Sequence, residues 1–422
     1  MRTLIVSNLF PPRVLGGYEQ ACFRIASGLV ERGHDVVVLT STSTREAQAP
    51  RGLTVERSLN LRAFERVPNP NASIKRLLDH ECMISQTVNS FLLLDAVRRH
   101  RPDQVILFNL VGLGGLGLID VLESLGVPWT FNLGDNVPVR LIDGHDPEIA
   151  AVYGARDGEV FSRGSVSAVS QTLVDEIRES GIPLDTRVEI IPRGIASVLP
   201  RTRPYLDGGH ARFVAASSLH RFKGIDIIID AAARLAESGQ DDFTVEIFGG
   251  GDAAPFREQA EELGVADRVT FPGFISPSDL MKVHSRSDAF LFPTWEREPG
   301  ASAPFEAAAA GCLPILTSSC GPAERLVDGI HCIKIRRDPQ ALAEAMQDVC
   351  EGRIDLEAMR EACAALIAGD LAFDTSLDRL EALLDSNPAP VAGRDDGVAI
   401  ERRILDKDAE ALELLYAGLP AA

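Results

Sequence analysis

The feature that most constrains the fold is a rhythm of short apolar runs and helical segments that begins twice. The first series starts with an apolar, β-branched run at 3–7, continues with apolar residues at helical spacing, and reaches a second apolar run at 35–40. The second series starts at 212–216 and alternates in the same way. Continuous apolar strands separated by helices are typical of parallel sheets covered on both faces. The sequence therefore predicts an α/β protein with two doubly wound, Rossmann-like domains.

Prolines indicate where the two series are joined, because they cluster at positions 183, 192, 200 and 204. We predict an N-terminal domain over 1–200 and a C-terminal domain over 201–385, with a linker near 195–210. Residues 386–422 begin with an Asn-Pro-Ala-Pro segment and then become acidic. We expect an acidic tail that contains one helix at about 406–416 and is mobile outside that helix.

The composition excludes several classes of protein. The 42 Lys and Arg against 61 Asp and Glu leave a net charge of −19, which would repel nucleic acid and anionic membranes. The 7 cysteines are scattered without a Cys-x-x-Cys pair, which favours reduced thiols and a cytoplasmic location. The most apolar stretch, 105–119, is shorter than the roughly 20 residues of a membrane span. We predict a buried strand that enters a glycine-rich loop there, no integral membrane segment and no nucleic-acid partner.

Two loops that follow predicted strands contain residues suited to binding an anion. In the loop 8–19, Gly16 and Gly17 precede a helix, where paired glycines permit positive φ and let backbone N–H groups approach a phosphate. A turn that simply requires glycine explains that loop equally well. In the loop 217–224, Arg221 and Lys223 precede a helix N-terminus, an unfavourable place for cations unless an anionic ligand compensates them. Two solvated surface cations are the alternative.

A third loop, from Trp295 to the helix after it, is the most informative. Glu298 lies in the loop and Glu306 in the first turn of the helix, with the small residues Ala301 and Ser302 between them. Two carboxylates in this arrangement could bind two separate polyols, for example a sugar ring and a ribose. A carboxylate that stabilises the helix dipole and a solvated loop carboxylate are the alternative readings.

Taken together, these segments resemble the family 4 glycosyltransferases of the GT-B fold, over roughly residues 1–385. The resemblance depends on Phe10-Pro11-Pro12 with Gly16-Gly17, Ser170, Ile191-Pro192-Arg193-Gly194, Phe222-Lys223-Gly224, Phe248 to Asp252, Val269 to Phe274, and Glu298-x7-Glu306. It implies two domains that face an interdomain cleft. It also implies retaining, hexosyltransferase-type transfer from a nucleotide-sugar donor to a hydroxyl acceptor (a glycan, a polysaccharide precursor or a small molecule), without a metal or another cofactor.

The resemblance also implies roles for matching residues. Gly16 and Gly17 would face the donor diphosphate from one domain, and Lys223 would bind it from the other. Glu298 would hold hydroxyls of the transferred sugar, Glu306 would hold the ribose diol, and backbone groups near Phe274 would meet the nucleobase. The remaining expected donor-site residues are Ser218, Arg221, Ala301 and Ser302.

Three positions depart from the family pattern. Ser218 stands where the family usually has Arg, a role that Arg221 could take over, and Arg193 replaces a usual Asn. Gly134 stands where the family often has a His that reaches the donor sugar. Asp135 remains and is expected to contact the sugar or the acceptor. Because the His is missing, a catalytically inactive nucleotide-sugar-binding protein is an alternative.

Gly112, Gly114 and Gly117 offer a competing interpretation, since they match the Gly-x-Gly-x-x-Gly pattern of a dinucleotide site. An NAD-dependent oxidoreductase or a nucleotide-sugar epimerase is therefore a second alternative. The pattern follows an internal strand, however, and we interpret the glycines as a close-packed crossover. The Asp-x-Asp triplet at 406–408, on the predicted terminal helix, is expected to face solvent and not to bind a metal.

Overall fold

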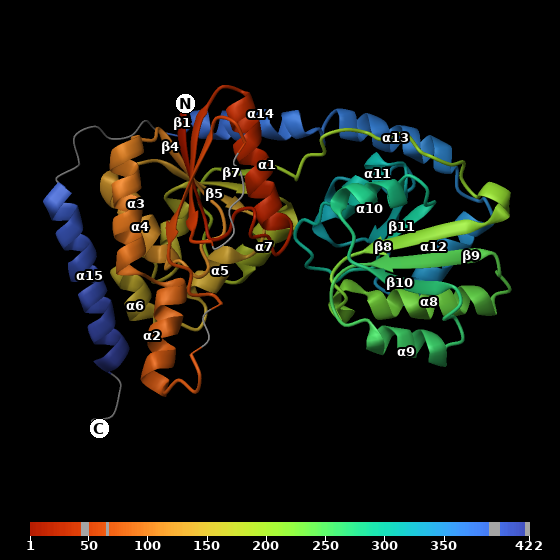
Figure 1. The fold of residues 1–422 in the computed structure, drawn as a ribbon, viewed down its shortest axis with the longest axis horizontal. Coiled ribbons are helices and arrows are strands. Elements are labelled where there is room, and N and C mark those ends of the chain that lie inside the picture. The colour runs from red at the N-terminus through yellow and green to blue at the C-terminus, as the bar shows by residue number, and fades with distance from the viewer. Residues whose placement is uncertain (44–49, 65–66, 388–396, 418–422) are drawn as a thin grey trace. The chain divides into compact units, whose positions relative to one another are not determined.

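A computed structural model describes residues 1–43, 50–64, 67–387 and 397–417 (Figure 1). The chain forms two units with separate sets of internal contacts. Unit 1 comprises Met1–Val169, Leu173–Ile191 and the chain from Leu377 onward, and unit 2 comprises Ser170–Thr172 and Pro192–Ser376. The chain therefore leaves unit 1, builds unit 2, and returns.

The centre of unit 1 is a parallel sheet of seven strands in the order β3-β2-β1-β4-β5-β6-β7. Its strands are β1 (Arg2–Ser7), β2 (Asp35–Ser41), β3 (Leu53–Leu59), β4 (Gln104–Leu107), β5 (Trp129–Leu133), β6 (Ser165–Ala168) and β7 (Val188–Ile190). Its helices are α1 (Gly17–Glu31), α2 (Ala72–Met83), α3 (Thr87–His100), α4 (Gly115–Leu125), α5 (Val137–Ile142), α6 (Pro147–Val152), the 3-10 turn η1 (Glu159–Ser162), α7 (Gln171–Glu179), α14 (Phe373–Asp385) and α15 (Gly397–Ala417). The chain crosses between the units at the start of α7 and within α14.

Unit 2 contains a parallel sheet of six strands in the order β10-β9-β8-β11-β12-β13. Its strands are β8 (Ala211–Ala216), β9 (Phe243–Phe248), β10 (Val269–Gly273), β11 (Ala289–Phe292), β12 (Leu313–Thr317) and β13 (Ile333–Ile335). Its helical elements are η2 (Asp207–Gly209), η3 (Arg221–Lys223), α8 (Ile225–Glu237), α9 (Ala254–Glu262), α10 (Pro277–His284), α11 (Ala303–Ala309), η4 (Gly321–Glu324), α12 (Pro339–Cys350) and α13 (Leu356–Ala368).

Both sheets are buried on two faces, as the continuous apolar strands predict. In β8, Phe213 belongs to one core cluster and Val214, which points to the other face, belongs to another. Successive side chains of a strand alternate between faces, so each face of the sheet has its own packed core. The predicted α/β class with two doubly wound domains is confirmed.

Each sheet has a point where the strand order reverses, between β1 and β4 in unit 1 and between β8 and β11 in unit 2. In open α/β sheets, ligands bind outside the carboxyl ends of the strands at such a point. The loops after β1 and β8 are the ones that contain Gly16 and Lys223, and the loop after β11 contains Glu298. The topology therefore selects the same loops as the sequence motifs.

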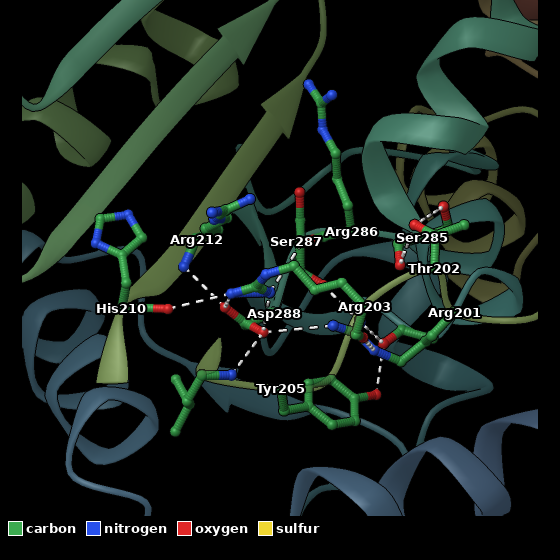
Figure 2. Close-up of polar contacts among 12 residues, drawn as sticks. Arg201, Thr202, Arg203, Tyr205, His210, Arg212, Ser285, Arg286, Ser287 and Asp288 are labelled. Carbon is green, nitrogen blue, oxygen red and sulfur yellow. Dashed lines mark hydrogen bonds and ion pairs between the residues drawn. The ribbon is translucent and has the colours of Figure 1, made fainter. Parts of the chain in front are cut away.

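The segment near 195–210, predicted as a linker, belongs to unit 2 and is bonded to the buried carboxylate of Asp288 (Figure 2). Asp288 is fully buried, and its carboxylate accepts hydrogen bonds from the backbone N–H groups of Leu206 and Arg212, at 3.2 and 2.8 Å. It also forms ion pairs with Arg201 and Arg203, at 3.4 and 3.1 Å. A buried carboxylate needs this many partners to offset the loss of water. The chain passes between the units at 191–192, earlier than the predicted boundary at 200–201.

The C-terminal segment also differs from the expectation of an acidic tail. Helix α15 is longer than predicted, and it packs against α2, α3, α4 and α6 of unit 1 (Figure 1). Asp408 was expected to face solvent, but it is 7% exposed. Its carboxylate accepts hydrogen bonds from Ser85, Thr87 and Tyr153. The expectation of a solvated triplet is wrong for Asp408, because hydroxyl groups distant in the sequence surround it.

None of the helices in the described ranges combines the length and apolar character required to cross a membrane. The apolar stretch at 105–119 forms β4, a glycine-rich loop and the start of α4, as predicted.

Candidate functional site

Lys223 and Glu298 form the centre of the candidate site in unit 2. The Nζ atom of Lys223 forms an ion pair and hydrogen bond with Oε2 of Glu298. The two side chains are 19% and 9% exposed, so the pair is largely shielded from water. The residues lie 75 positions apart, and the reversal of strand order brings their loops together.

A glycine allows these two loops to meet. Gly224 has a φ of +77°, and a Cβ atom there would lie 2.1 Å from the carbonyl oxygen of Pro293. Only glycine can combine a left-handed conformation with such a close approach of two backbones. The backbone N–H of Trp295 then donates to the carbonyl of Phe222, at 3.0 Å. The turn that positions Lys223 is thereby bonded to the loop of Glu298.

Glu298 is held in place by its own loop. The Trp295 Nε1–H and the Thr294 hydroxyl donate to its Oε2 atom, at 3.3 and 3.4 Å. Its backbone carbonyl accepts from the N–H of Gly321, at 2.8 Å. A Cβ atom at Gly321 would lie 2.0 Å from the carbonyl oxygen of Pro299, so this contact also requires glycine. Trp295, Thr294 and Gly321 are thus positioning residues.

Glu306 and Ser302 lie at the start of α11. The Ser302 hydroxyl donates to Oε1 of Glu306, at 2.8 Å. Ser302 precedes the helix, and Glu306 is in its first turn, where a carboxylate is favoured by the helix dipole. Both side chains are partly exposed, as is Ala301 before them. The expected ribose-binding carboxylate is therefore accessible and already oriented by a hydroxyl group.

Three other predicted donor-site residues of unit 2 are exposed. The side chain of Phe274, after β10, is 78% exposed. Ser218 is exposed in the loop after β8. Arg221 is 77% exposed at its side chain and forms a long ion pair of 3.7 Å with Asp226 of α8. The guanidinium of Arg221 is thus directed to its own helix, and no direct contact with Lys223 or Glu298 occurs among the bonds of the described residues.

The glycine pair in unit 1 differs from the expectation. Gly16 has a φ of −166°, which is extended backbone that any residue adopts, so the positive φ that a glycine permits is not used there. Both Gly16 and Gly17 are exposed. Glu19, which is buried, accepts hydrogen bonds from the N–H groups of Gly16 and Leu15, at 2.8 and 3.2 Å. A carboxylate of the chain itself therefore binds part of the expected anion site.

Asp135 lies in the exposed turn after β5, where its Oδ1 atom accepts from the N–H of Asn136, at 2.9 Å. The neighbouring Gly134 is buried. Two residues before Gly134, in β5, the carbonyl of Asn132 accepts a hydrogen bond from the hydroxyl of Tyr18, at 2.5 Å. The start of α1 is thereby fastened to the end of β5, so the Gly16 loop and the Asp135 turn belong to one edge of unit 1.

The dinucleotide interpretation does not agree with the packing of its glycines. A Cβ atom at Gly114 would lie 2.3 Å from the backbone nitrogen of Gln86, and one at Gly117 would lie 2.4 Å from the hydroxyl of Ser85. The N–H groups of Gly112 and Gly114 donate to the carbonyl of Cys82. The chain itself therefore covers the loop that a pyrophosphate would need to approach. The interpretation as a close-packed crossover is confirmed.

Sequence reasoning missed Glu19, Thr294 and Gly321 as parts of the site. The spacing of Glu19 was readable, because an acid three residues after a helix N-cap commonly accepts from backbone N–H groups there. Thr294 and Gly321 had no comparable signal, since their roles depend on contacts between loops.

Comparisons with known proteins agree over most of the chain. The family described as glycosyl transferases group 1 matches residues 204–365, and the family described as glycosyl transferase 4-like domain matches residues 16–194. The lipopolysaccharide glucosyltransferase WaaG of Escherichia coli is 30% identical over 77% of this chain and 82% of its own length. Glycogen synthase of Mycobacterium tuberculosis is 24% identical over 89% of this chain and 92% of its own. The crystal structure of Anabaena HepE with UDP-glucose is similar in fold, with a TM-score of 0.67 and 18% identity over 92% of this chain and all of that one.

Proposed function

The chain belongs to the group 1 glycosyltransferases and has the GT-B fold, and we propose that it transfers a sugar, with retention and without a metal ion, from a nucleoside diphosphate sugar to a hydroxyl group of an acceptor. The observation that supports this proposal best is the shielded pair of Lys223 and Glu298 at the point where the strand order of unit 2 reverses. The crystal structure of HepE contains UDP-glucose, which suggests a uridine nucleotide as the first donor to test.

Donor binding in this proposal exchanges the partners of the pair. Lys223 turns from the carboxylate to the diphosphate, and Glu298 accepts hydrogen bonds from hydroxyls of the sugar. The exchange is favourable because each charge keeps a charged or polar partner and neither is left alone in a shielded place. Trp295 and Thr294 continue to orient the carboxylate during the exchange.

The charge that develops on the leaving diphosphate is stabilised by Lys223 in the transition state. Cations that are already positioned contribute strongly to such reactions, since they need no reorganisation as the bond breaks. The departing phosphate oxygen takes the proton of the acceptor hydroxyl, as the family resemblance implies. Glu306 holds the ribose diol through its accessible carboxylate, and the turn at Asp135 in unit 1 contacts the sugar or the acceptor.

Calorimetric titration with UDP and with uridine tests the phosphate role. Lys223→Ala should weaken UDP binding roughly tenfold to a hundredfold, the effect of losing a hydrogen bond between charged groups, and leave uridine binding unchanged. Lys282→Ala, which removes an exposed lysine of α10, is the control and should change neither. Equal losses for UDP and uridine would refute the phosphate role. The double variant Lys223→Ala/Glu298→Gln avoids an unpaired shielded carboxylate and should show the same selectivity.

Glu306→Gln separates the ribose role from the phosphate role. It should weaken uridine and UDP by the same factor, because the ribose is common to both. Unchanged affinity for both would contradict the ribose assignment.

Product analysis with UDP-glucose and an acceptor distinguishes transfer from epimerisation. Binding of the donor without turnover of any acceptor would instead support the inactive binding protein that Gly134 suggests.

A further inference from the structure

Unit 1 contains a cavity of about 630 Å³ that none of the roles above uses. One wall is formed by α2, a second by α5 with the loop after it, and a third by the C-terminal half of α15. Its charged lining comes from α2 and from residues 140–146, and its apolar lining from α2, α6 and α15. Its volume falls in the range of small-molecule sites, which is roughly 300–1,000 Å³.

The charged side chains in this cavity do not satisfy one another. Arg76 and Arg140 come from different helices, and neither guanidinium has a hydrogen bond or ion pair with any residue in the described part of the chain. The same holds, within those residues, for the carboxylates of Asp79 and Asp143. All four residues are exposed, so water solvates these groups, and they line the open side of the cavity as donors and acceptors from opposite elements that do not bond across it.

The balance of charge in the cavity selects the class of ligand. Two guanidinium groups are opposed by three carboxylates, one of which, in Asp146, also accepts the N–H of Glu148. Burial lowers the pKa of His145, which keeps its imidazole neutral near pH 7. The charges nearly cancel, so neither a strongly anionic nor a strongly cationic ligand is favoured. A neutral polyol satisfies both kinds of group, because each hydroxyl both donates and accepts.

An apolar surface completes the cavity. Met83 of α2, Ile149 of α6 and the leucines Leu414 and Leu415 of α15 supply it. A pyranose ring has the matching shape, since its hydroxyls lie around the edge and its C–H groups form an apolar face. Carboxylates and guanidinium groups beside apolar side chains can therefore bind both parts of the ring.

Helix α15 is fixed to unit 1 by hydrogen bonds and ion pairs along its length. Besides the three hydroxyl groups that bond Asp408, Lys407 forms an ion pair of 2.6 Å with Asp120 of α4. Near its end, the hydroxyl of Tyr416 donates to the carbonyl of Ser73 at the start of α2, at 3.4 Å. The helix also lies outside both regions that match the glycosyltransferase families.

We propose that the cavity between α2, α5 and α15 binds a neutral pyranose ring of the acceptor, so that α15 takes part in choosing the acceptor. That the bound sugar is the acceptor rests on the proposed function, whereas the existence of a sugar site rests on the cavity alone. Asp79 and Asp143 accept from hydroxyls, Arg76 and Arg140 donate to ring and hydroxyl oxygens, and the leucines of α15 contact the C–H face.

Saturation-transfer NMR on the full chain tests the sugar site, with maltotriose, methyl α-D-mannopyranoside and myo-inositol as probes, each with and without UDP. At least one probe should receive saturation from the protein methyl groups on its C–H protons. The double variant Asp79→Asn/Asp143→Asn should lower the affinity for that probe at least tenfold. Asp241→Asn/Asp267→Asn makes the same charge change at exposed positions of unit 2 and should have no effect.

A second pair of variants tests the helix. Leu414→Asp places a charge in the cavity and should abolish the NMR saturation transfer to the sugar probe. Leu405→Asp, at an exposed position of the same helix, should leave that saturation transfer unchanged. Alkylation of Cys82 by iodoacetamide, followed by peptide mass spectrometry, gives an independent readout because this thiol lines the cavity. A bound sugar should slow the alkylation of Cys82 and not that of Cys350 in unit 2.

The outcomes separate this inference from the proposed function. The inference is overturned, even if UDP binds, when none of the three probes receives NMR saturation from the protein. It is also overturned when the Asp79→Asn/Asp143→Asn variant binds the probe as tightly as the wild type. Tighter binding of glucose 1-phosphate than of every neutral probe also overturns it, since the site would then select an anion. Sugar binding by a chain that binds no nucleotide would sustain the sugar site and overturn the acceptor role together with the proposed function.

Discussion

Glycines in the two units serve different purposes at equivalent places. In unit 2, Gly224 and Gly249 lie where backbones touch, and a Cβ atom at Gly249 would lie 1.7 Å from the carbonyl oxygen of Ser217. In unit 1, Gly16 lies in extended backbone with no other atom within 4 Å of an added Cβ. Glycine in the loop after β8 of unit 2 thus brings two loops into contact, whereas glycine in the loop after β1 of unit 1 keeps a surface open. The same residue type in a strand-to-helix loop does not identify which purpose applies.

The largest effect is expected from exchanging glycine for alanine in the two loops. Gly224→Ala should destabilise unit 2 by at least about 3 kcal/mol, because it combines a left-handed φ with a steric overlap against Pro293. Gly16→Ala should change stability by no more than about 0.5 kcal/mol. Urea unfolding measures both, because the chain has 2 tryptophans, Trp129 in unit 1 and Trp295 in unit 2.

Single-tryptophan variants, Trp295→Phe and Trp129→Phe, make each unfolding transition visible by itself. The Gly224→Ala change should move the transition reported by Trp295. Equal stability losses from the two alanine substitutions would remove the distinction between the loops.

Acid should then test whether the units share a weakness, since each contains a buried histidine. The pKa of His284 in unit 2 is lowered from 6.5 to about 4 by burial alone, and neither ring nitrogen has a partner in the described structure. The pKa of His80 in unit 1 is also lowered to about 4, mainly by burial, although Asp408 opposes this and His145 adds to it. The folded state binds the proton more weakly than the unfolded state in both cases. Stability is therefore complete above about pH 6.5 and falls as the pH drops toward 4, by at most roughly 3 kcal/mol per histidine.

His284→Leu should remove this acid sensitivity from the transition of Trp295 and leave the transition of Trp129 unchanged. The unpaired nitrogens make the apolar replacement tolerable. A Trp295 transition that still shifts by the same amount between pH 6.5 and 4 would show that other groups in unit 2 are responsible.

The smallest effect is expected at the helix start in unit 1. Glu19→Gln keeps the shape of the side chain but replaces charge-assisted hydrogen bonds to Gly16 and Leu15 with neutral ones. It should cost about 0.5–1 kcal/mol in the transition of Trp129. Glu31→Gln, at the other end of α1, is the control, and it should not destabilise the helix because it removes a negative charge near the C-terminus. An equal loss in both variants would refute the role of Glu19.

Much of the fold could be predicted because its strands are continuous apolar runs. The apolar run at 35–40 lies within β2 (Asp35–Ser41) and ends one residue before it, since a strand buried on both faces has an unambiguous apolar signal. The loops that hold Lys223 and Glu298 could be predicted for the same reason, as each follows such a strand. Their direct pairing could not, because it depends on the contact of Gly224 with Pro293, which no local pattern encodes.

The terminal helix shows the opposite limit. Its acidic residues suggested a solvated face, and Asp408 is instead bonded to Ser85, Thr87 and Tyr153, more than 250 residues earlier. Only the tertiary structure reveals hydroxyl groups around a carboxylate. The extended backbone of Gly16 was equally hidden, because glycine is compatible with both signs of φ.

The path of the chain between the two units has a consequence for biosynthesis. Residues 192–376 of unit 2 are continuous, so this unit can complete its core on the ribosome as soon as they have been translated. The α/β core of unit 1 emerges first, but its outer surface over α3 and α4 stays uncovered until α15 arrives about 200 residues later. Until then, the apolar residues of unit 1 that pack against Ile400, Ile404 and Ala411 of α15 lack this cover.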